Sequence, residues 1–96
     1  MTILPLQGRT ALVSGGGGPL GRAFSVGLGR AGARVILVGR NEQALAGAAA
    51  RVAEEGGATR TAMCDVSDPA SVTALTDTLA DENISVLVKM RASRAR

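Results

Sequence analysis

Residues 10–22 read TALVSGGGGPLGR, and this stretch decides which fold the chain can adopt. Residues 10–13 form a short apolar run, Ser14 and four glycines follow it, and a helical pattern begins at Leu20. Backbone N–H groups at the start of a helix have no partner within the helix, and the helix dipole adds partial positive charge there. Glycines leave no Cβ in the way, so the turn can admit an anion such as a pyrophosphate to the main chain.

The rest of the chain alternates short apolar runs with longer helical patterns. The runs at 34–38, 62–65 and 84–88 are apolar on both faces, which is typical of parallel strands covered by helices above and below. The expected helices cover residues 20–31, a segment between Asn41 and Gly56, and a segment that begins at Asp68 and Pro69. With right-handed crossovers, this order predicts one α/β domain over residues 1–88, an open parallel sheet with helices on both faces.

The periodicity of each helical pattern also predicts its apolar side. The expected positions are Leu20, Ala23, Phe24 and Leu28 in the first helix; Leu45, Ala48, Ala49 and Val52 in the second; and Val72, Leu75 and Leu79 in the third.

Composition excludes several kinds of chemistry. The chain has no His, Tyr or Trp, its only aromatic residue is Phe24, and its only cysteine is Cys64. A Ser-His-Asp triad, a His-based metal site and an intrachain disulfide are therefore ruled out. We expect Cys64 to be a small core residue and not a nucleophile, since no His or Lys lies near it in the sequence to lower its pKa.

The net charge of +3 comes from one end of the chain. Residues 1–88 are close to neutral, and residues 89–96 add Lys89, Arg91, Arg94 and Arg96. We predict that 89–96 is a disordered basic tail. Nucleic-acid binding through this tail is a weaker alternative, because the chain offers almost no aromatic side chains on which bases could stack. No apolar run approaches the ~20 residues of a membrane span and no secretory signal is evident, so we expect a cytoplasmic protein with no membrane contact.

Residues 8–88 resemble the amino-terminal part of a short-chain dehydrogenase/reductase, whose glycine motif is Thr-Gly-x-x-x-Gly-x-Gly. Ser14 stands in place of the Thr, Gly15 and Gly21 match the first and third glycines, and Pro19 replaces the second. Proline is well tolerated at the first helical position, so we expect the turn to persist. The resemblance implies a partial Rossmann fold with strand order 3-2-1-4, and a cofactor site that includes Ser14, Gly15, Gly17, Gly18, Leu20 and Gly21.

The end of the second strand indicates which dinucleotide binds. An acidic residue there would accept a hydrogen bond from a free ribose 2′-hydroxyl, whereas an arginine suits a 2′-phosphate. Gly39 is followed by Arg40, and no acid appears before Glu42. The sequence therefore favours NADP(H) over NAD(H). The alternative for Arg40 is an ordinary solvated side chain that pairs with Glu42.

Asp65 and Val66, after the third apolar run, are similar to an Asp-Val pair of the same family. The resemblance implies that the Asp65 carboxylate accepts from the adenine amino group and that Val66 packs on the ring. The alternative for Asp65 is a routine turn residue.

The resemblance ends abruptly after the fourth run. The family continues with Asn-Asn-Ala-Gly, whereas this chain continues with residues 89–96. Loss of one base from codons for Asn-Asn-Ala-Gly-Ile-Ala-Gly can give Lys-Met-Arg-Ala-Ser-Arg-Ala, the order found at 89–95. We therefore hypothesise a frameshift in the gene of a longer ketone–alcohol reductase. Sequencing of the gene would reject this if no single-base change restores a long reading frame.

The Tyr-x-x-x-Lys motif and the serine on which catalysis in this family depends have no counterparts here, so the sequence predicts no catalytic residue and a chain that is inactive by itself. A non-catalytic nucleotide-binding or regulatory module is the alternative. In either case the predicted strand order leaves the fourth strand as an exposed edge, through which the chain could associate with another.

Overall fold

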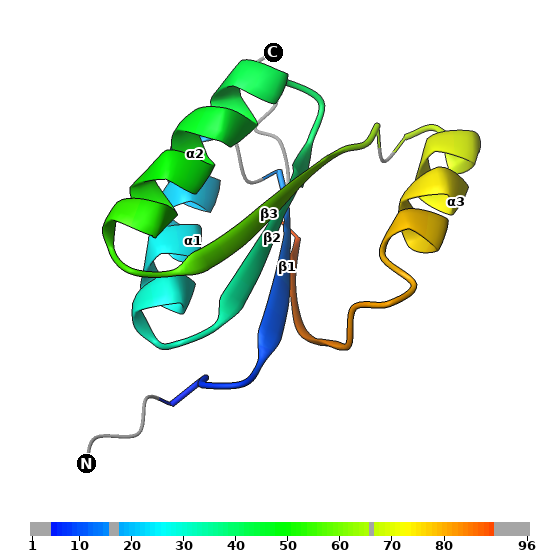
Figure 1. The fold of residues 1–96 in the computed structure, drawn as a ribbon. Coiled ribbons are helices and arrows are strands. Elements are labelled where there is room, and N and C mark those ends of the chain that lie inside the picture. The colour runs from blue at the N-terminus through cyan, green and yellow to red at the C-terminus, as the bar shows by residue number, and fades with distance from the viewer. Residues whose placement is uncertain (1–4, 16–17, 66, 90–96) are drawn as a thin grey trace.

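The computed structural model describes residues 5–15, 18–65 and 67–89, which form seven elements in strict β/α alternation (Figure 1). The strands are β1 (Thr10–Ser14), β2 (Arg34–Gly39), β3 (Ala58–Met63) and β4 (Ile84–Lys89), and the helices are α1 (Pro19–Arg30), α2 (Glu42–Glu54) and α3 (Pro69–Thr78). Two predicted site residues, Gly17 and Val66, lie outside the described residues, as does the tail from residue 90 onward. Lys89, which we assigned to the tail, is the last residue of β4.

The strands form one parallel sheet in the order β3-β2-β1-β4, which confirms the predicted topology. Helices α1 and α2 lie on one face of this sheet and α3 lies on the other (Figure 1). In the centre of the sheet Val13 is in register with Leu37 on β2 and with Val88 on β4. Strand β4 therefore lies at one edge of the described sheet and β3 at the other.

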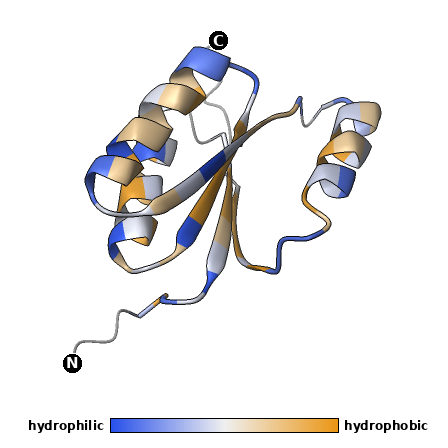
Figure 2. Ribbon diagram, viewed as in Figure 1, coloured by the Kyte–Doolittle hydropathy of each residue, from blue (hydrophilic) through white to orange (hydrophobic). Residues whose placement is uncertain are grey.

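Alternation along the strands builds two separate cores. The most hydrophobic residues, orange in Figure 2, lie along the central strands of the sheet. The core under α1 and α2 contains Val13, Val35, Leu37, Leu45, Ala48 and Val52. The core on the α3 face is smaller and contains Ile36, Val38, Cys64 and Leu79. Cys64 is thus a core residue, as expected.

The third strand begins and ends earlier than we predicted. We expected it at 62–65, and it spans Ala58–Met63. None of its residues is buried, because β3 is an edge strand with a neighbour on one side only. Thr59 and Thr61 favour the extended conformation through β-branching, which a search for apolar runs does not detect.

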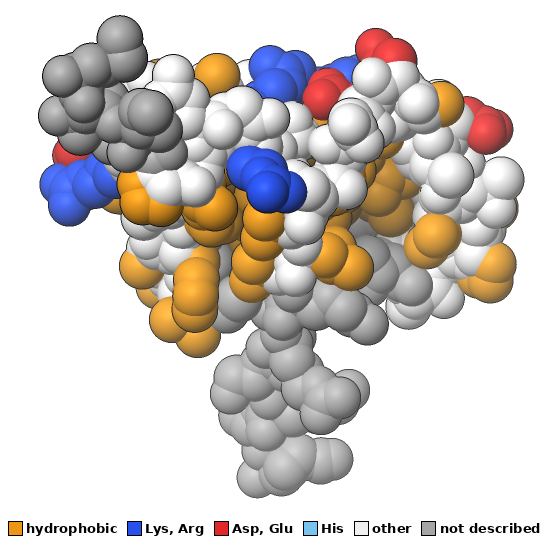
Figure 3. Space-filling model, turned by 90° about the horizontal axis from the view of Figure 1, so that it is seen from below, with side chains coloured by type: hydrophobic (Ala, Val, Ile, Leu, Met, Phe, Trp, Pro, Cys, Tyr) orange, Lys and Arg blue, Asp and Glu red, His pale blue; other side chains and the backbone are white. Residues whose placement is uncertain are grey.

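The buried side of α1 also differs from the prediction. Leu20 and Phe24 are 61% and 47% exposed, and with Ala23, Gly27 and Leu28 they line a surface hollow of about 350 Å³. The buried residues of α1 are instead Gly21, Ser25 and Gly29. Small residues on this side allow close packing, since a Cβ on Gly29 would lie only 2.8 Å from Val52 Cγ1 of α2. Exposed hydrophobic side chains are also evident in the surface view of Figure 3.

Helix α3 packs loosely and has no buried residue of its own. Val72, which we expected in the core, is an exposed hydrophobic residue. Leu75 is partly buried, and Leu79, just after the helix, is buried against the sheet. The predicted buried side of this helix is therefore correct only toward its carboxyl end.

Candidate functional site

Three segments meet at the carboxyl edge of the sheet because backbone hydrogen bonds join them. The N–H of Gly15, after β1, donates to the carbonyl oxygen of Val38 on β2 at 2.8 Å. The N–H of Cys64, after β3, donates to the carbonyl oxygen of Gly39 at 2.9 Å. The chain thus leaves β1, β2 and β3 at adjacent points. The carboxyl edge of a parallel sheet is where α/β proteins of this kind bind ligands.

Two glycines between β1 and α1, Gly15 and Gly18, are among the described residues. Gly15 has φ of +77°, a left-handed backbone that side chains disfavour. Gly18 is the N-cap of α1, and its carbonyl oxygen accepts from the N–H of Arg22 at 2.8 Å. Pro19 occupies the first position of the helix, where proline is well tolerated. A Cβ on Gly18 would lie 3.9 Å from the Gly15 oxygen, so packing within the turn does not demand glycine there.

A cleft of about 340 Å³ opens beside this turn. It brings together three predicted site residues, Gly15, Gly18 and Arg40, and adds Gly39, Asn41, Ala44 and Leu45. Asn41 and Ala44 were not in our predicted set. Asn41 caps α2 by accepting from the N–H of Ala44 at 3.0 Å, so the cap that the sequence predicted for the helix also forms a wall of the cleft.

The remaining predicted residues of the first turn do not line this cleft. Ser14 is half-buried at the end of β1, and Leu20 points its exposed side chain into the hollow on the outer side of α1. Gly21 is buried, and its carbonyl oxygen accepts from Ser25 Oγ at 2.7 Å. Its position suits close packing of the helix against the sheet, a role that the third glycine of such motifs has in dinucleotide-binding domains.

Arg40 is an exposed residue directly after β2. Its side chain takes part in none of the ion pairs found among the described residues, so the alternative pairing with Glu42 is not observed there. Arg40, which lines the cleft, is therefore available for a charge-assisted contact with an anion.

Asp65 is held by two hydrogen bonds from Ser67. The Ser67 hydroxyl and N–H both donate to Asp65 Oδ1, at 2.6 Å and 3.0 Å. These bonds lower the pKa of Asp65, and the positive charge of Arg40 lowers it further. The carboxyl group is therefore an ionised hydrogen-bond acceptor at neutral pH. Sequence reasoning missed Ser67, although a serine two residues after an aspartate is a common turn signal.

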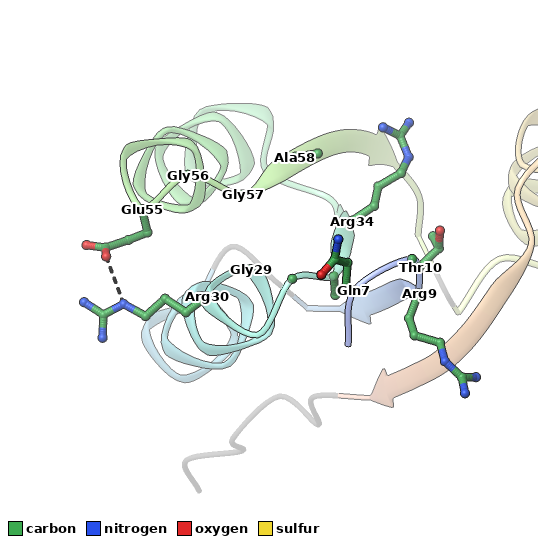
Figure 4. Close-up of a pocket in the computed structure, with 13 residues that line it drawn as sticks. Gln7, Arg9, Thr10, Gly29, Arg30, Arg34, Glu55, Gly56, Gly57 and Ala58 are labelled. Atoms are coloured by element: carbon green, nitrogen blue, oxygen red, sulfur yellow. Dashed lines mark hydrogen bonds and ion pairs between the residues drawn. The ribbon is translucent and has the colours of Figure 1, made fainter. Parts of the chain in front are cut away.

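A larger hollow of about 540 Å³ lies at the opposite, amino edge of the sheet (Figure 4). Three arginines border it, but their side chains project away from one another in Figure 4. Arg30 Nε donates to Glu55 Oε1 at 2.9 Å, and Arg34 Nη2 donates to Glu82 Oε2 at 3.1 Å. Because two of these cations already have partners and none converge, this hollow is a poorer anion site than the cleft beside Gly15.

Metal and membrane sites receive no support from the described residues. No cluster of three or more His, Cys, Asp or Glu side chains that could hold a metal ion occurs among them. Within the same part of the chain, no helix has the length and apolar character needed to span a bilayer.

The sheet order and the glycine turn define an α/β domain of the Rossmann type. The family model for short chain dehydrogenases matches residues 9–90, and the chain belongs to this family. It is 39% identical over 90 residues to a short chain dehydrogenase/reductase, dpmpG, of Macrophomina phaseolina, an alignment that covers 91% of this chain and 51% of that relative.

Solved structures of longer chains share the fold. NAD+-bound xylitol dehydrogenase is 33% identical with a TM-score of 0.81, and the match covers 86% of this chain and 33% of that one. A 3-oxoacyl (acyl-carrier-protein) reductase from Agrobacterium tumefaciens C58 with NADP bound is 33% identical with a TM-score of 0.83, covering 97% and 36%. This chain therefore spans about half of the curated relative and about a third of these solved chains, and both dinucleotides occur among its neighbours.

Proposed function

We propose that this chain is the NADP(H)-binding part of a short-chain dehydrogenase/reductase. The whole protein would interconvert a ketone and an alcohol by hydride transfer, with the nicotinamide as hydride donor or acceptor. One observation carries the proposal: a single cleft is lined by Gly15, Gly18 and Arg40 together. The amino end of a helix, glycines that leave the approach to it open, and a nearby arginine are what a phosphorylated dinucleotide requires.

Each part of the dinucleotide has a proposed contact. The pyrophosphate binds at the turn between β1 and α1, where glycine leaves the backbone accessible. The ribose 2′-phosphate binds Arg40, and no carboxylate among the residues lining the cleft would repel it. The ionised carboxylate of Asp65 accepts from the adenine amino group. The preference for NADP(H) thus rests on Arg40.

Cofactor binding and turnover are separate properties in this proposal. The tyrosine that the family uses as proton donor has no counterpart, since the chain contains no tyrosine at all. Its single lysine, Lys89, lies at the end of β4. We therefore propose that this chain binds the dinucleotide without catalysing hydride transfer by itself.

Titration of the purified chain with NADPH and with NADH tests the proposal. Calorimetry measures both dissociation constants, and circular dichroism of the same sample establishes that the protein is folded. We expect binding of both dinucleotides, with NADPH bound at least tenfold more tightly, the advantage of one charge-assisted contact worth ~1.4 kcal/mol. A folded chain that binds neither dinucleotide overturns the site, and a chain that prefers NADH overturns the role of Arg40.

A further inference from the structure

Two serines bind two different groups of Asp65. The hydroxyl and the N–H of Ser67 both donate to Asp65 Oδ1. In addition, Ser71 Oγ on α3 accepts from the N–H of Asp65 at 3.0 Å. The side chain of Asp65 is therefore oriented by Ser67, while its backbone is anchored to α3 by Ser71. A side chain held in this way loses little freedom when it binds a ligand.

The two bonds from Ser67 end at the same oxygen. The hydrogen bonds that described residues donate to this carboxylate all reach Oδ1, which leaves the lone pairs of Oδ2 for a ligand. An ionised carboxylate has no hydrogen to donate, so Oδ2 can accept from an N–H group and repels a carbonyl oxygen at the same place. Such a site distinguishes a purine with an amino group at C6 from one with a carbonyl group at C6.

We propose that Ser67 is a positioning residue that makes this site select 6-aminopurine over 6-oxopurine dinucleotides. Ser67 acts through Asp65 and makes no contact of its own with the base. The inference rests on the proposed function, because it assumes that the dinucleotide binds with its base near Asp65. Arg40 and the glycine turn contact the phosphates in both kinds of ligand, so they contribute nothing to this discrimination.

The test compares NADPH with its analogue that carries hypoxanthine in place of adenine and is otherwise identical. For the unaltered chain we expect roughly tenfold tighter binding of NADPH, the effect of one hydrogen bond to a charged group. Ser67→Ala should reduce this preference to roughly threefold or less. Ser67→Thr keeps a hydroxyl and should preserve the preference, and Asp65→Asn should abolish it. Ser85→Ala, a matched change on the exposed surface of β4, should have no effect.

A second measurement follows the pKa of Asp65 by NMR of its carboxyl carbon in the absence of any dinucleotide. Loss of the Ser67 hydroxyl should raise this pKa toward its ordinary value. A raised pKa with an unchanged preference for adenine overturns the positioning role, although the cofactor site itself stands. Failure of the folded, unaltered chain to bind either dinucleotide overturns the proposed function and this inference together.

Discussion

The backbone N–H of Gly15 lies 2.8 Å from the carbonyl oxygen of Val38, and this hydrogen bond fastens the glycine turn to the end of the neighbouring strand. It continues the parallel register in which Ser14 pairs with Val38. Because β2 ends at the next residue, Gly39, the residue that follows it, Arg40, lines the same cleft as Gly15. The hydrogen bond between Gly15 and Val38 thus holds the glycine turn next to Arg40, the residue proposed to select the cofactor.

Gly15→Ala should weaken both folding and cofactor binding. A side chain at φ of +77° costs about 1–2 kcal/mol of unfolding free energy, and the new methyl group also narrows the approach to the main chain. We expect at least roughly tenfold weaker NADPH binding by calorimetry, or ~1.4 kcal/mol. Gly8→Ala is the matched control, because Gly8 has φ of +82° and lies at the opposite edge of the sheet. Equal losses of affinity in the two variants would place the pyrophosphate elsewhere.

Arg40→Asp should reverse the preference between the two dinucleotides. It removes a cation and sets a carboxylate against the 2′-phosphate, so NADPH affinity should fall by about 10–100-fold, as expected for loss of a charged hydrogen bond. NADH affinity should change little or improve, because a carboxylate can accept from the free 2′-hydroxyl. Arg51→Asp makes the same charge change near the end of α2, where Arg51 is an exposed residue, and should alter neither affinity. Similar responses of both variants would indicate a general effect of charge.

Gly29→Ala should destabilise the fold although it improves helix propensity. The added Cβ meets Val52 Cγ1 at 2.8 Å in the contact between α1 and α2, and overpacking of this kind typically costs about 1–3 kcal/mol. Gly27→Ala gains the same propensity on the same helix, but its Cβ has no neighbour within 4 Å. We expect it to stabilise the chain by about 1 kcal/mol. Urea unfolding measures both changes.

The same contact predicts coupling between two positions. Val52→Ala removes the methyl group that the new Cβ would strike, so Gly29→Ala should cost less in that background. Strictly additive effects of the two substitutions would show that α1 and α2 do not touch at this point.

The stabilising effect of Glu82 should be lost as the pH falls into the acidic range. Arg34 on β2 and Arg60 on β3 both donate to its carboxylate, and these hydrogen bonds lower the pKa of Glu82. A carboxyl group with a lowered folded pKa stabilises the fold fully above its unfolded pKa, about 4.3, and loses that effect as pH falls through the folded value. Glu82→Gln should therefore make the thermal unfolding temperature depend less steeply on pH in this acidic range.

Glu54→Gln is the control for this experiment. Glu54 is exposed and lies 3.8 Å from Arg51 in a contact within one helix, which contributes little. The two variants should differ in the slope of stability against pH, and identical slopes would contradict the role of Glu82.

The free edge of β4 should promote association between chains. Leu87 on this strand is 64% exposed, and β4 has a neighbour on only one side within the described sheet. Unpaired edges with exposed apolar side chains favour pairing with another chain. Leu87→Arg should lower the weight-average mass in sedimentation at high protein concentration. Gln43→Arg adds the same charge at an exposed position of α2 and should leave the mass unchanged.

Local signals accounted for most of the architecture. Pro19 begins α1, Asn41 and Asp68 cap the next two helices, and the strand order is as predicted. The third strand and the buried side of α1 were not predicted correctly. Apolar periodicity shows which side of an element can be buried, but the buried residues of α1 are Gly21, Ser25 and Gly29, and α2 approaches the helix closely at Gly29.

The amino-acid sequence by itself determined the succession of strands, turns and helices, because proline, glycine and capping side chains restrict the backbone within a few residues of themselves. Only the tertiary structure decided that Gly15, Gly18 and Arg40, which follow two different strands, border one cleft. These relationships depend on which strands are neighbours and where each one ends. They arise from parallel pairing between segments far apart in the chain, which no local pattern of residues encodes.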